Sequence, residues 1–230
     1  MKTIVVITAY NEEKTIGKVL DDLKRHGYHN IVVVNDCSKD KTESISLKKK
    51  AVVLSHFTNR GQGAALATGT EYALRQGADI IVHFDADGQM MVEDIPAMIA
   101  PIQKKQADVT IGSRFLGKES NMPVSKRILL VLGRVWLRLF GVKLTDSQCG
   151  FRALSRKGAQ QIEIRQDRSE HASEILIEIF KKHIQYKEVP VTIKYTEYSV
   201  QHTQHGRFQL LSAIRIAFKT VLKQVIKSMR

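Results

Sequence analysis

Short apolar runs rich in β-branched residues alternate with helix-period segments through the first half of the chain. The connections between these runs are long enough for crossovers, so the strands are expected to lie mostly parallel. Helices covering both faces of such a sheet make an α/β fold. Pro96 and Pro101 lie inside one predicted helix, where proline removes a backbone donor and can kink the chain. The predicted strands are residues 4–8, 31–35, 52–54, 80–84 and 109–111, and the predicted helices are residues 15–25, 64–75 and 94–103.

The pattern changes after Gly112. A helix is predicted at residues 126–140, a mixed stretch runs through residue 184, and residues 187–195 have a strand pattern. Residues 208–230 carry an apolar stripe bordered by Arg and Lys, which predicts a basic amphipathic helix. The expected division is one domain over residues 1–206, with halves at residues 1–115 and 116–206, followed by a C-terminal helix at residues 207–230.

Composition fits one domain with a sizeable core, since 43% of the 230 residues are hydrophobic. The formal net charge of +13 favours an anionic partner, either nucleic acid, anionic lipid or nucleotide phosphate. Aromatic residues make up only 7% and the basic residues are spread among helices, which argues against nucleic acid. No apolar stretch reaches the ~18 residues of a spanning helix, and the N-terminus leads directly into a strand, so a cytoplasmic protein is expected. Cys37 and Cys149 form no CxxC pair, so neither a disulfide nor a zinc site is expected.

Two carboxylates and an amide follow the fourth predicted strand, as Asp85, Asp87 and Gln89. In an extended chain, residues two apart project to the same side, so Asp85 and Asp87 can reach one cation while Ala86 points away. Gly88 permits a sharp turn beside them. Mg²⁺ commonly takes one or two carboxylates together with substrate phosphate oxygens and water. The pattern predicts a divalent metal that holds a diphosphate, although an isolated Asp-x-Asp could also be a solvated turn.

Polar residues also follow the first two predicted strands. Either Asn11 or Glu12 is available to begin the next helix, where Asn11 would be a simple N-cap. Asp36 could accept hydrogen bonds from a nucleobase N–H or from ribose hydroxyls, or it could form an Asx turn.

Three further segments contain candidate ligand-binding groups. Gly61 and Gly63 precede a helix, so backbone N–H groups and the positive helix end could approach an anion there. The spacing does not fit the dinucleotide fingerprint, and no Walker lysine is present. Arg114 follows the fifth strand and could hold a diphosphate in bidentate geometry, or it could be a surface residue. Residues 146–152 combine an acid, an amide, a glycine and an arginine in one irregular segment, which suits an acceptor pocket.

Four motifs therefore occur in order: Ala9-Tyr10-Asn11-Glu12, Asp85-Ala86-Asp87-Gly88-Gln89, Gly112-Ser113-Arg114 and Gln148-Cys149-Gly150-Phe151-Arg152. In this order the chain resembles the inverting family-two glycosyltransferases of GT-A fold. The branch it resembles contains dolichyl-phosphate mannose synthase and polyprenyl-phosphate glucosyltransferase, and the resemblance covers residues 4 to about 190. Thr8 stands where the family usually has proline, and Asn35 stands where it often has an acid, which leaves the donor base open.

The resemblance implies a role for each candidate residue. The 1–115 half would bind the nucleotide sugar and the metal, and the 116–206 half would bind the acceptor. Mg²⁺ or Mn²⁺ would be held against the diphosphate, and a loop after the last strand would contact phosphate. The implied nucleotide-sugar contacts are Ala9, Tyr10, Glu12, Asp36, Gly63, Asp85, Ala86 and Arg114; the metal ligands are Asp85, Asp87 and Gln89; the catalytic groups are Asp87, Arg114 and Asp146; and the acceptor contacts are Gln148, Arg152, His205 and Arg207.

The expected activity is transfer of a hexose, with inversion, from a GDP-mannose or UDP-glucose type of donor. A polyprenyl phosphate acceptor would be largely ionised at neutral pH and would need no strong base. A sugar hydroxyl acceptor would need one, and Asp146 is then the first candidate. The alternatives are a nucleotide-sugar-binding protein without catalysis and a sugar nucleotidyltransferase.

Two basic, apolar segments bear on the membrane. Residues 126–140 place Arg127, Arg134 and Arg138 on one face of a predicted helix, with Trp136 suited to an interface. Residues 208–230 resemble a helix that lies on anionic lipid. Either helix could instead cover the sheet or a dimer partner, with lysine stems over apolar surface. A peripheral position at the inner face of the membrane is expected, and a separate membrane protein could receive the product.

Overall fold

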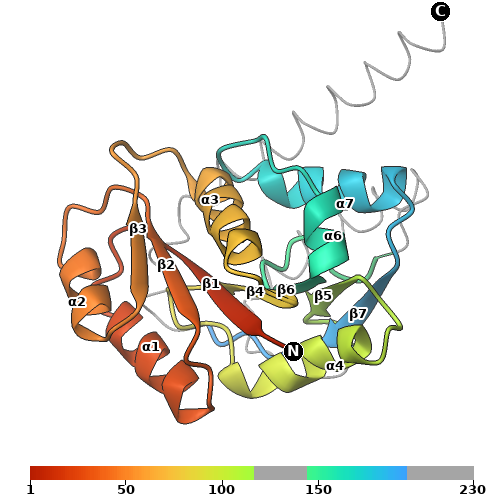
Figure 1. Cartoon of the computed structure of the whole chain (residues 1–230), viewed down its shortest axis with the longest axis horizontal. Helices are drawn as coiled ribbons and strands as arrows, with labels where there is room; N and C mark the ends of the chain where they lie inside the picture. Colours follow the sequence, from red (N-terminus) through yellow and green to blue (C-terminus); the bar gives the residue numbers. More distant parts are fainter. Residues whose placement is uncertain (117–143, 196–230) are drawn as a thin grey trace, which may run out of the picture. The chain divides into compact units, whose positions relative to one another are not determined.

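The computed structural model describes residues 1–116 and 144–195. Seven strands and seven helices are assigned within these ranges, and all of them belong to the unit Met1–Tyr195 (Figure 1). The strands are β1 (Thr3–Ala9), β2 (Ile31–Asn35), β3 (Val52–Ser55), β4 (Ile80–Asp85), β5 (Val109–Ser113), β6 (Arg152–Ser155) and β7 (Tyr186–Pro190). The helices are α1 (Ile16–Arg25), α2 (Thr42–Lys48), α3 (Gln62–Arg75), the 3₁₀ turn η1 (Val92–Asp94), α4 (Ile95–Gln103), α6 (Arg156–Gln161) and α7 (His171–Lys181).

The strands form one sheet in the order β3-β2-β1-β4-β6-β5-β7. Only β6 runs antiparallel, between β4 and β5, and every other pair is parallel. The prediction of a mostly parallel α/β sheet is therefore confirmed. In this arrangement the carboxyl ends of β1, β4 and β5 share one edge of the sheet, where ligands of open α/β sheets bind.

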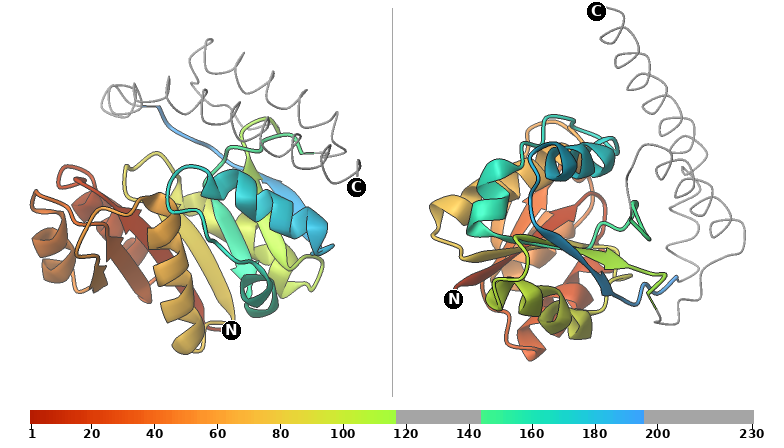
Figure 2. Two further views of the ribbon diagram at one scale, coloured as in Figure 1. Left: turned by 90° about the horizontal axis from the view of Figure 1, so that it is seen from above. Right: turned by 90° about the vertical axis from the view of Figure 1, so that its right-hand side faces the viewer.

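Helices cover both faces of the sheet (Figures 1 and 2). Along β1, Val5 and Ile7 pack with α1 and α4 in one buried cluster, whereas Ile4 and Val6 pack with α3 and α7 in another. This alternation follows from the two-residue repeat of a strand. Because both faces are buried, the inner strands read as continuous apolar runs.

Helix α3 lies very close to the sheet at Gly69. A Cβ added there would be 2.2 Å from Val6 Cγ1 and 3.0 Å from Val34 Cγ2. We expect Gly69→Ala to lower the free energy of unfolding by about 1–3 kcal/mol, since the added methyl overpacks a rigid interface. Urea unfolding measures the change. Gly17→Ala is the control, because its nearest neighbour is a side-chain carbon at 3.3 Å and alanine favours a helix. Equal stability of the two variants would contradict this packing.

Three local predictions differ from the structure. Helix α2 was not predicted, because its sequence TESISLK is short and polar. Helix α1 begins at Ile16 after Thr15, so Asn11 is not its N-cap; Asn11 has a positive φ of 55° and its side chain accepts from Lys39 N at 2.8 Å. The strand predicted at residues 187–195 ends at Pro190. The helices predicted at residues 126–140 and 207–230 lie outside the described residues.

In residues 1–116 and 144–195, none of the helices combines the length and hydrophobicity that a bilayer-spanning helix needs.

Candidate active site

The aspartate pair lies where the sequence places it, at the carboxyl end of β4. Asp85 is the last residue of this strand, and Gly88 has the positive φ of 74° that the following turn requires. Within the turn, Gln89 N donates to Asp87 Oδ1 at 3.0 Å. Met90 then pairs with Ile193 in an isolated antiparallel bridge, so the chain after β7 runs beside this turn. The turn is thus fixed at both ends, with Asp85 and Asp87 half-buried.

Asp85 is held from two neighbouring elements. Gln62, at the start of α3, donates from Nε2 to Asp85 Oδ1 at 2.8 Å. On the other side, a Cβ added to Gly150 would be 3.1 Å from Asp85 Oδ2, so the glycine leaves room for this carboxylate. Burial and the nearby charge of Asp87 raise the pKa of Asp85 to about 7, against the opposing influence of Arg152 and Gln62. Two crowded carboxylates that disfavour joint ionisation are a natural place for a cation.

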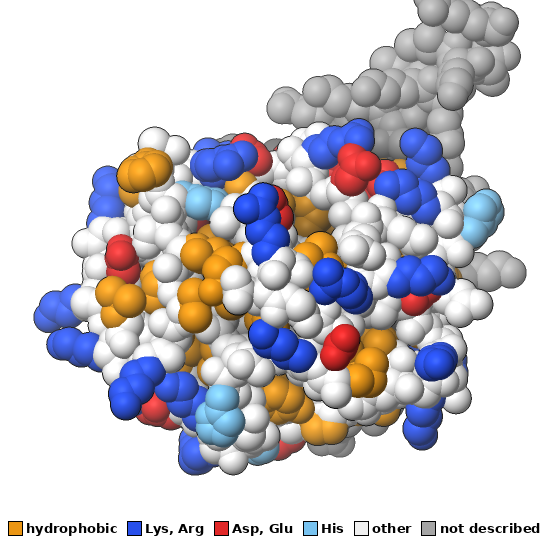
Figure 3. All heavy atoms as spheres, in the orientation of Figure 1, with side chains coloured by type: hydrophobic (Ala, Val, Ile, Leu, Met, Phe, Trp, Pro, Cys, Tyr) orange, Lys and Arg blue, Asp and Glu red, His pale blue; other side chains and the backbone are white. Residues whose placement is uncertain are grey.

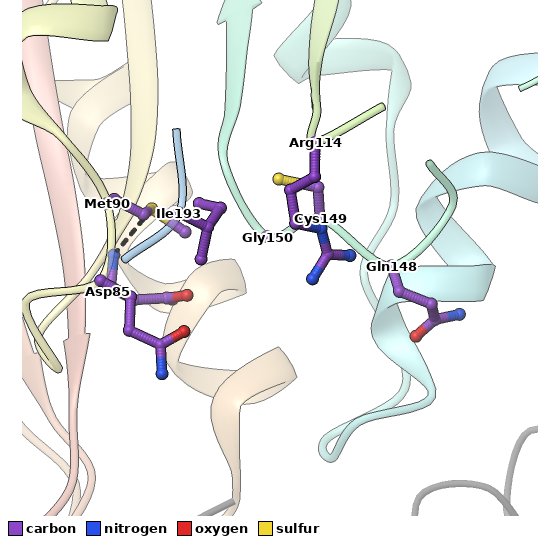
Figure 4. Close-up of a pocket in the computed structure, with 8 residues that line it drawn as sticks. Asp85, Met90, Arg114, Gln148, Cys149, Gly150 and Ile193 are labelled. Carbon is purple, nitrogen blue, oxygen red and sulfur yellow. Dashed lines mark hydrogen bonds between the residues drawn. The ribbon is translucent and has the colours of Figure 1, made fainter. Parts of the chain in front are cut away.

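A pocket opens beside Asp85 (Figure 4). Asp85 and Met90 lie on one side of it, and Arg114 and Gln148 lie on the other. Its lining combines the end of β4 and the turn after it, the residue that follows β5, the segment before β6 and Ile193 after β7, which are distant in sequence. The lining residues are Asp85, Gln89, Met90, Arg114, Gln148, Cys149, Gly150 and Ile193.

Arg114 is fixed by a buried network. Its Nε and Nη2 donate to the two carboxylate oxygens of Asp146 at 2.6 and 2.7 Å, and its Nη1 donates to Tyr195 OH at 2.9 Å. Burial alone would lower the pKa of Arg114, but the hydrogen bonds and charge of Asp146 outweigh burial and raise it. A guanidinium has five N–H donors, and these three bonds leave two of them. Arg114 is therefore oriented and can still donate to an anion in the pocket.

The same network bears on the prediction that Asp146 acts as a general base. Asp146 is 2% exposed and both of its carboxylate oxygens accept from Arg114, so the geometry does not support the prediction of a general base. The neighbouring Thr145 donates from its N and Oγ1 to Glu188 at 2.8 and 2.6 Å. Sequence reasoning missed Glu188 and Tyr195, because no local pattern connects them with partners that lie 43 and 81 positions earlier in the chain.

The residues predicted around the nucleotide lie at the ends of β1 and β2. Ala9 is buried, Tyr10 is 45% exposed, and Glu12 N donates to Thr42 Oγ1 at 2.7 Å. Asp36 forms no Asx turn, since it is Asn35 whose side chain accepts from Ser38 N. The contacts of these residues with a nucleotide stay predictions.

Asp36 instead holds the loop between β3 and α3. Its Oδ1 is hydrogen-bonded to His56 Nδ1 at 2.7 Å and to Arg60 N at 2.9 Å, and its Oδ2 accepts from Gly61 N at 2.6 Å. The carboxylate thereby takes the place that an external anion was expected to fill at the start of α3.

The role expected for Gly63 must be corrected. A Cβ on Gly63 would be 2.0 Å from Gln166 O, and the next amide, Ala64 N, donates to Asp167 O at 3.1 Å. The start of α3 is thus covered by the segment before α7 and does not face an open anion site there. Gly63 permits this close backbone approach, and the adjacent Gln62 reaches Asp85. Sequence reasoning did not single out Gln62. Its place as a polar residue at the start of a helix could have suggested a role in the site.

The residues expected to contact the acceptor lie in three different settings. Gln148 is exposed and lines the pocket. Arg152 begins β6 and is 0% exposed, so the structure contradicts its predicted contact with an acceptor: the antiparallel strand turns its side chain into the protein. His205 and Arg207 lie outside the described residues.

The model of the family described as Glycosyl transferase family 2 matches residues 4–162, which include the aspartate turn, Arg114, Asp146 and β6. The chain belongs to this family. It is 37% identical over 85% of its length to UDP-N-acetylglucosamine--dolichyl-phosphate N-acetylglucosaminyltransferase of Methanococcus voltae, covering 87% of that protein. It is 32% identical to undecaprenyl-phosphate mannosyltransferase of Micrococcus luteus, over 66% of each chain. The resemblance to the polyprenyl-phosphate branch is confirmed.

The GT-A fold is confirmed by solved structures. Glucosyl-3-phosphoglycerate synthase from Mycobacterium tuberculosis, in complex with Mn²⁺, UDP-glucose and phosphoglyceric acid, superposes with a TM-score of 0.71. The match covers 94% of this chain and 79% of that one, at 18% sequence identity. Agreement at this level concerns the fold.

The ligand atoms that the protein offers suit a metal ion that is bound partly by the protein and partly by the substrate. In the described ranges, no group of three or more His, Cys, Asp and Glu side chains is arranged to hold an ion. Asp85, Asp87 and the amide of Gln89 offer oxygen ligands only, and two carboxylates leave several positions for phosphate and water. This composition fits Mg²⁺ or Mn²⁺ bound together with a diphosphate.

Proposed function

We propose that this family-two glycosyltransferase transfers a hexose or an N-acetylhexosamine, with inversion, from a nucleoside diphosphate sugar to a polyprenyl phosphate. The observation that carries the proposal is the paired carboxylates at the end of β4, of which Asp85 lines one pocket together with the oriented guanidinium of Arg114. The names of the two relatives support the acceptor class. They name different sugars, so the proposal covers donors of the GDP-mannose, UDP-glucose and UDP-N-acetylglucosamine types.

In this mechanism Asp85, Asp87 and Gln89 hold Mg²⁺ or Mn²⁺. The ion, when bound, neutralises charge that grows on the departing nucleoside diphosphate. Arg114 directs its two remaining N–H donors at the same phosphates, and Asp146 and Tyr195 keep it in place. Preorganised donors of this kind stabilise developing charge without reorganisation during the reaction.

The state of Asp146 favours a phosphate acceptor over a hydroxyl acceptor. A hydroxyl nucleophile needs a base, and Asp85 is the single carboxylate among the described residues that line the pocket. Asp85 already serves the metal in this mechanism. A phosphate monoester with a second pKa near 6 is largely ionised at neutral pH and attacks without a base.

Charge distribution supports contact with an anionic membrane. The ranges 117–143 and 196–230 hold a third of the Lys and Arg residues but only two of the 23 acidic ones. On the face shown in Figure 3, basic side chains of the described residues are scattered among acidic ones and gather in no stripe that would suit nucleic acid. A peripheral position at the cytoplasmic face of the membrane, near the lipid acceptor, follows from the proposal. The proposal also includes two protein partners: a separate membrane protein that receives the product, and a second copy of this chain in a homodimer.

Radiolabelled transfer tests the acceptor. We expect one nucleotide sugar of a panel, with Mg²⁺ or Mn²⁺, to label a polyprenyl phosphate product that extracts into organic solvent. The same polyprenol without phosphate should remain unlabelled, because its hydroxyl lacks the ionised oxygen. Labelling of a water-soluble sugar acceptor instead, or binding of the donor without any transfer, would contradict the proposal.

A further inference from the structure

Arg152 lies on the face of the sheet that also carries the first metal-binding carboxylate. In the antiparallel pair of β4 and β6, Arg152 is directly opposite His83. Side chains two apart on a strand share a face, so His83 and Asp85 project to the same side. The Cβ position of Gly150 lies 3.1 Å from Asp85 Oδ2, which places Asp85 beside the next same-face position of the strand that carries Arg152. A long side chain spans such a diagonal.

Within residues 1–116 and 144–195, the guanidinium of Arg152 has no hydrogen-bond partner. It is 0% exposed, and its Nε, Nη1 and Nη2 make no hydrogen bond in the described part of the structure. Burying an unpaired charge is strongly unfavourable, and an arginine cannot relieve the strain by losing its proton. A buried arginine without a hydrogen bond lowers the stability of the fold, so its presence here indicates that its charge has a function.

The polar neighbours of Arg152 do not neutralise it. His83 Nε2 is hydrogen-bonded to Thr70 Oγ1 at 2.9 Å, and His171 Nδ1 to Arg168 O at 2.7 Å. Burial, followed by the charge of Arg152, lowers the pKa of His171 to about 4. Neither of these hydrogen bonds involves Arg152, and the carboxylates whose charge acts on its guanidinium, Asp85 and Asp146, are not hydrogen-bonded to it.

We propose that Arg152 is a positioning residue that acts through Asp85, supplying a fixed buried charge that makes the metal-loaded site net positive toward a nucleoside diphosphate. The inference rests on the proposed function. Asp85 and Asp87 balance a divalent ion, and Asp146 balances Arg114. After these charges cancel, the positive charge of Arg152 is left over in the protein interior. It strengthens binding of an anion without contacting it.

Binding of UDP and GDP to the full-length protein, measured by calorimetry with and without Mn²⁺, tests this role. Arg152→Met removes the charge at similar side-chain length and should weaken Mn²⁺-dependent nucleotide binding by roughly tenfold, as expected for separated charges at an effective dielectric constant near 20. Arg152→Lys should recover most of the affinity. Binding of Mn²⁺ alone should be unchanged or tighter in Arg152→Met, because a repelling charge is gone.

Stability separates this role from a structural one. Urea unfolding should find Arg152→Met at least as stable as wild type, since apolar replacement of a buried charge is often neutral or stabilising. Arg152→Gln is a second neutral variant, should the methionine protein fail to fold. Arg75→Met removes one exposed charge from α3 and should leave nucleotide affinity as it is.

Two results would overturn the inference. One is wild-type nucleotide affinity in the neutral variants; the other is parallel loss of stability and Mn²⁺ binding in both Arg152→Met and Arg152→Lys. If the wild-type protein itself bound no nucleotide with Mn²⁺, the proposed function would fall together with this inference, whereas normal wild-type binding confines a failure to Arg152.

Discussion

Replacing Asp87 with asparagine should lower sugar transfer by about a thousandfold or more, which corresponds to roughly 4 kcal/mol of lost transition-state stabilisation. The amide keeps the oxygen that accepts from Gln89 N but loses the charge that a divalent ion requires. The fold should remain as stable as wild type, because Asp87 repels Asp85 in the metal-free protein. Initial rates with the preferred donor and saturating polyprenyl phosphate measure the effect.

The control for this variant is Glu71→Gln, which makes the same acid-to-amide change at an exposed position of α3. It should transfer sugar at the wild-type rate. Full activity of Asp87→Asn would remove Asp87 from the mechanism. Loss of activity together with a large loss of stability would assign the residue to the fold instead.

Replacing Asp146 with leucine should lower the free energy of unfolding by about 3–5 kcal/mol, because the buried charge of Arg114 is left without its partner. The carboxylate of Asp146 accepts from Arg114 Nε, Nη2 and N and from Gln148 N, so one substitution removes four hydrogen bonds. The side chains are 6% and 0% exposed, and water cannot replace what is lost. Urea unfolding of the purified protein gives the value.

A double variant distinguishes pairing from packing. Asp146→Leu combined with Arg114→Met removes both charges and should regain most of the lost stability, while transfer stays abolished because Arg114 is absent. Glu71→Ala, which breaks the exposed pair with Arg75, should change stability by no more than about 0.5 kcal/mol. A loss below about 1 kcal/mol in Asp146→Leu would show that the buried pair is not important for the fold.

Local sequence patterns predicted the parts of the site that are local in the chain. Asp85, Asp87 and Gln89 stand at and just after the end of one apolar strand, and Gly88 marks the turn, so one run of five positions, 85–89, carried the information. The parallel sheet followed likewise from alternation of runs and helices. The family resemblance then placed Arg114 near the diphosphate.

Long-range contacts were beyond this reasoning. Arg114 and Asp146 are 32 residues apart, and Gln62 and Asp85 are 23 apart, so neither pair leaves a periodic signal. The antiparallel β6 has only four residues, too few to reveal which face Arg152 occupies. Gly63 was interpreted as an anion contact because the segment that covers it, at Gln166 and Asp167, lies more than 100 residues later in the chain.

Crystals grown with Mn²⁺ and the nucleoside diphosphate of the preferred donor, measured at the manganese absorption edge, test the central claim most directly. The account predicts an anomalous peak bonded to oxygens of Asp85 and Asp87 and to the phosphates, with Arg114 donating to the same diphosphate. A nucleotide bound at the carboxyl ends of β1 and β4 with the manganese peak away from both aspartates would contradict it.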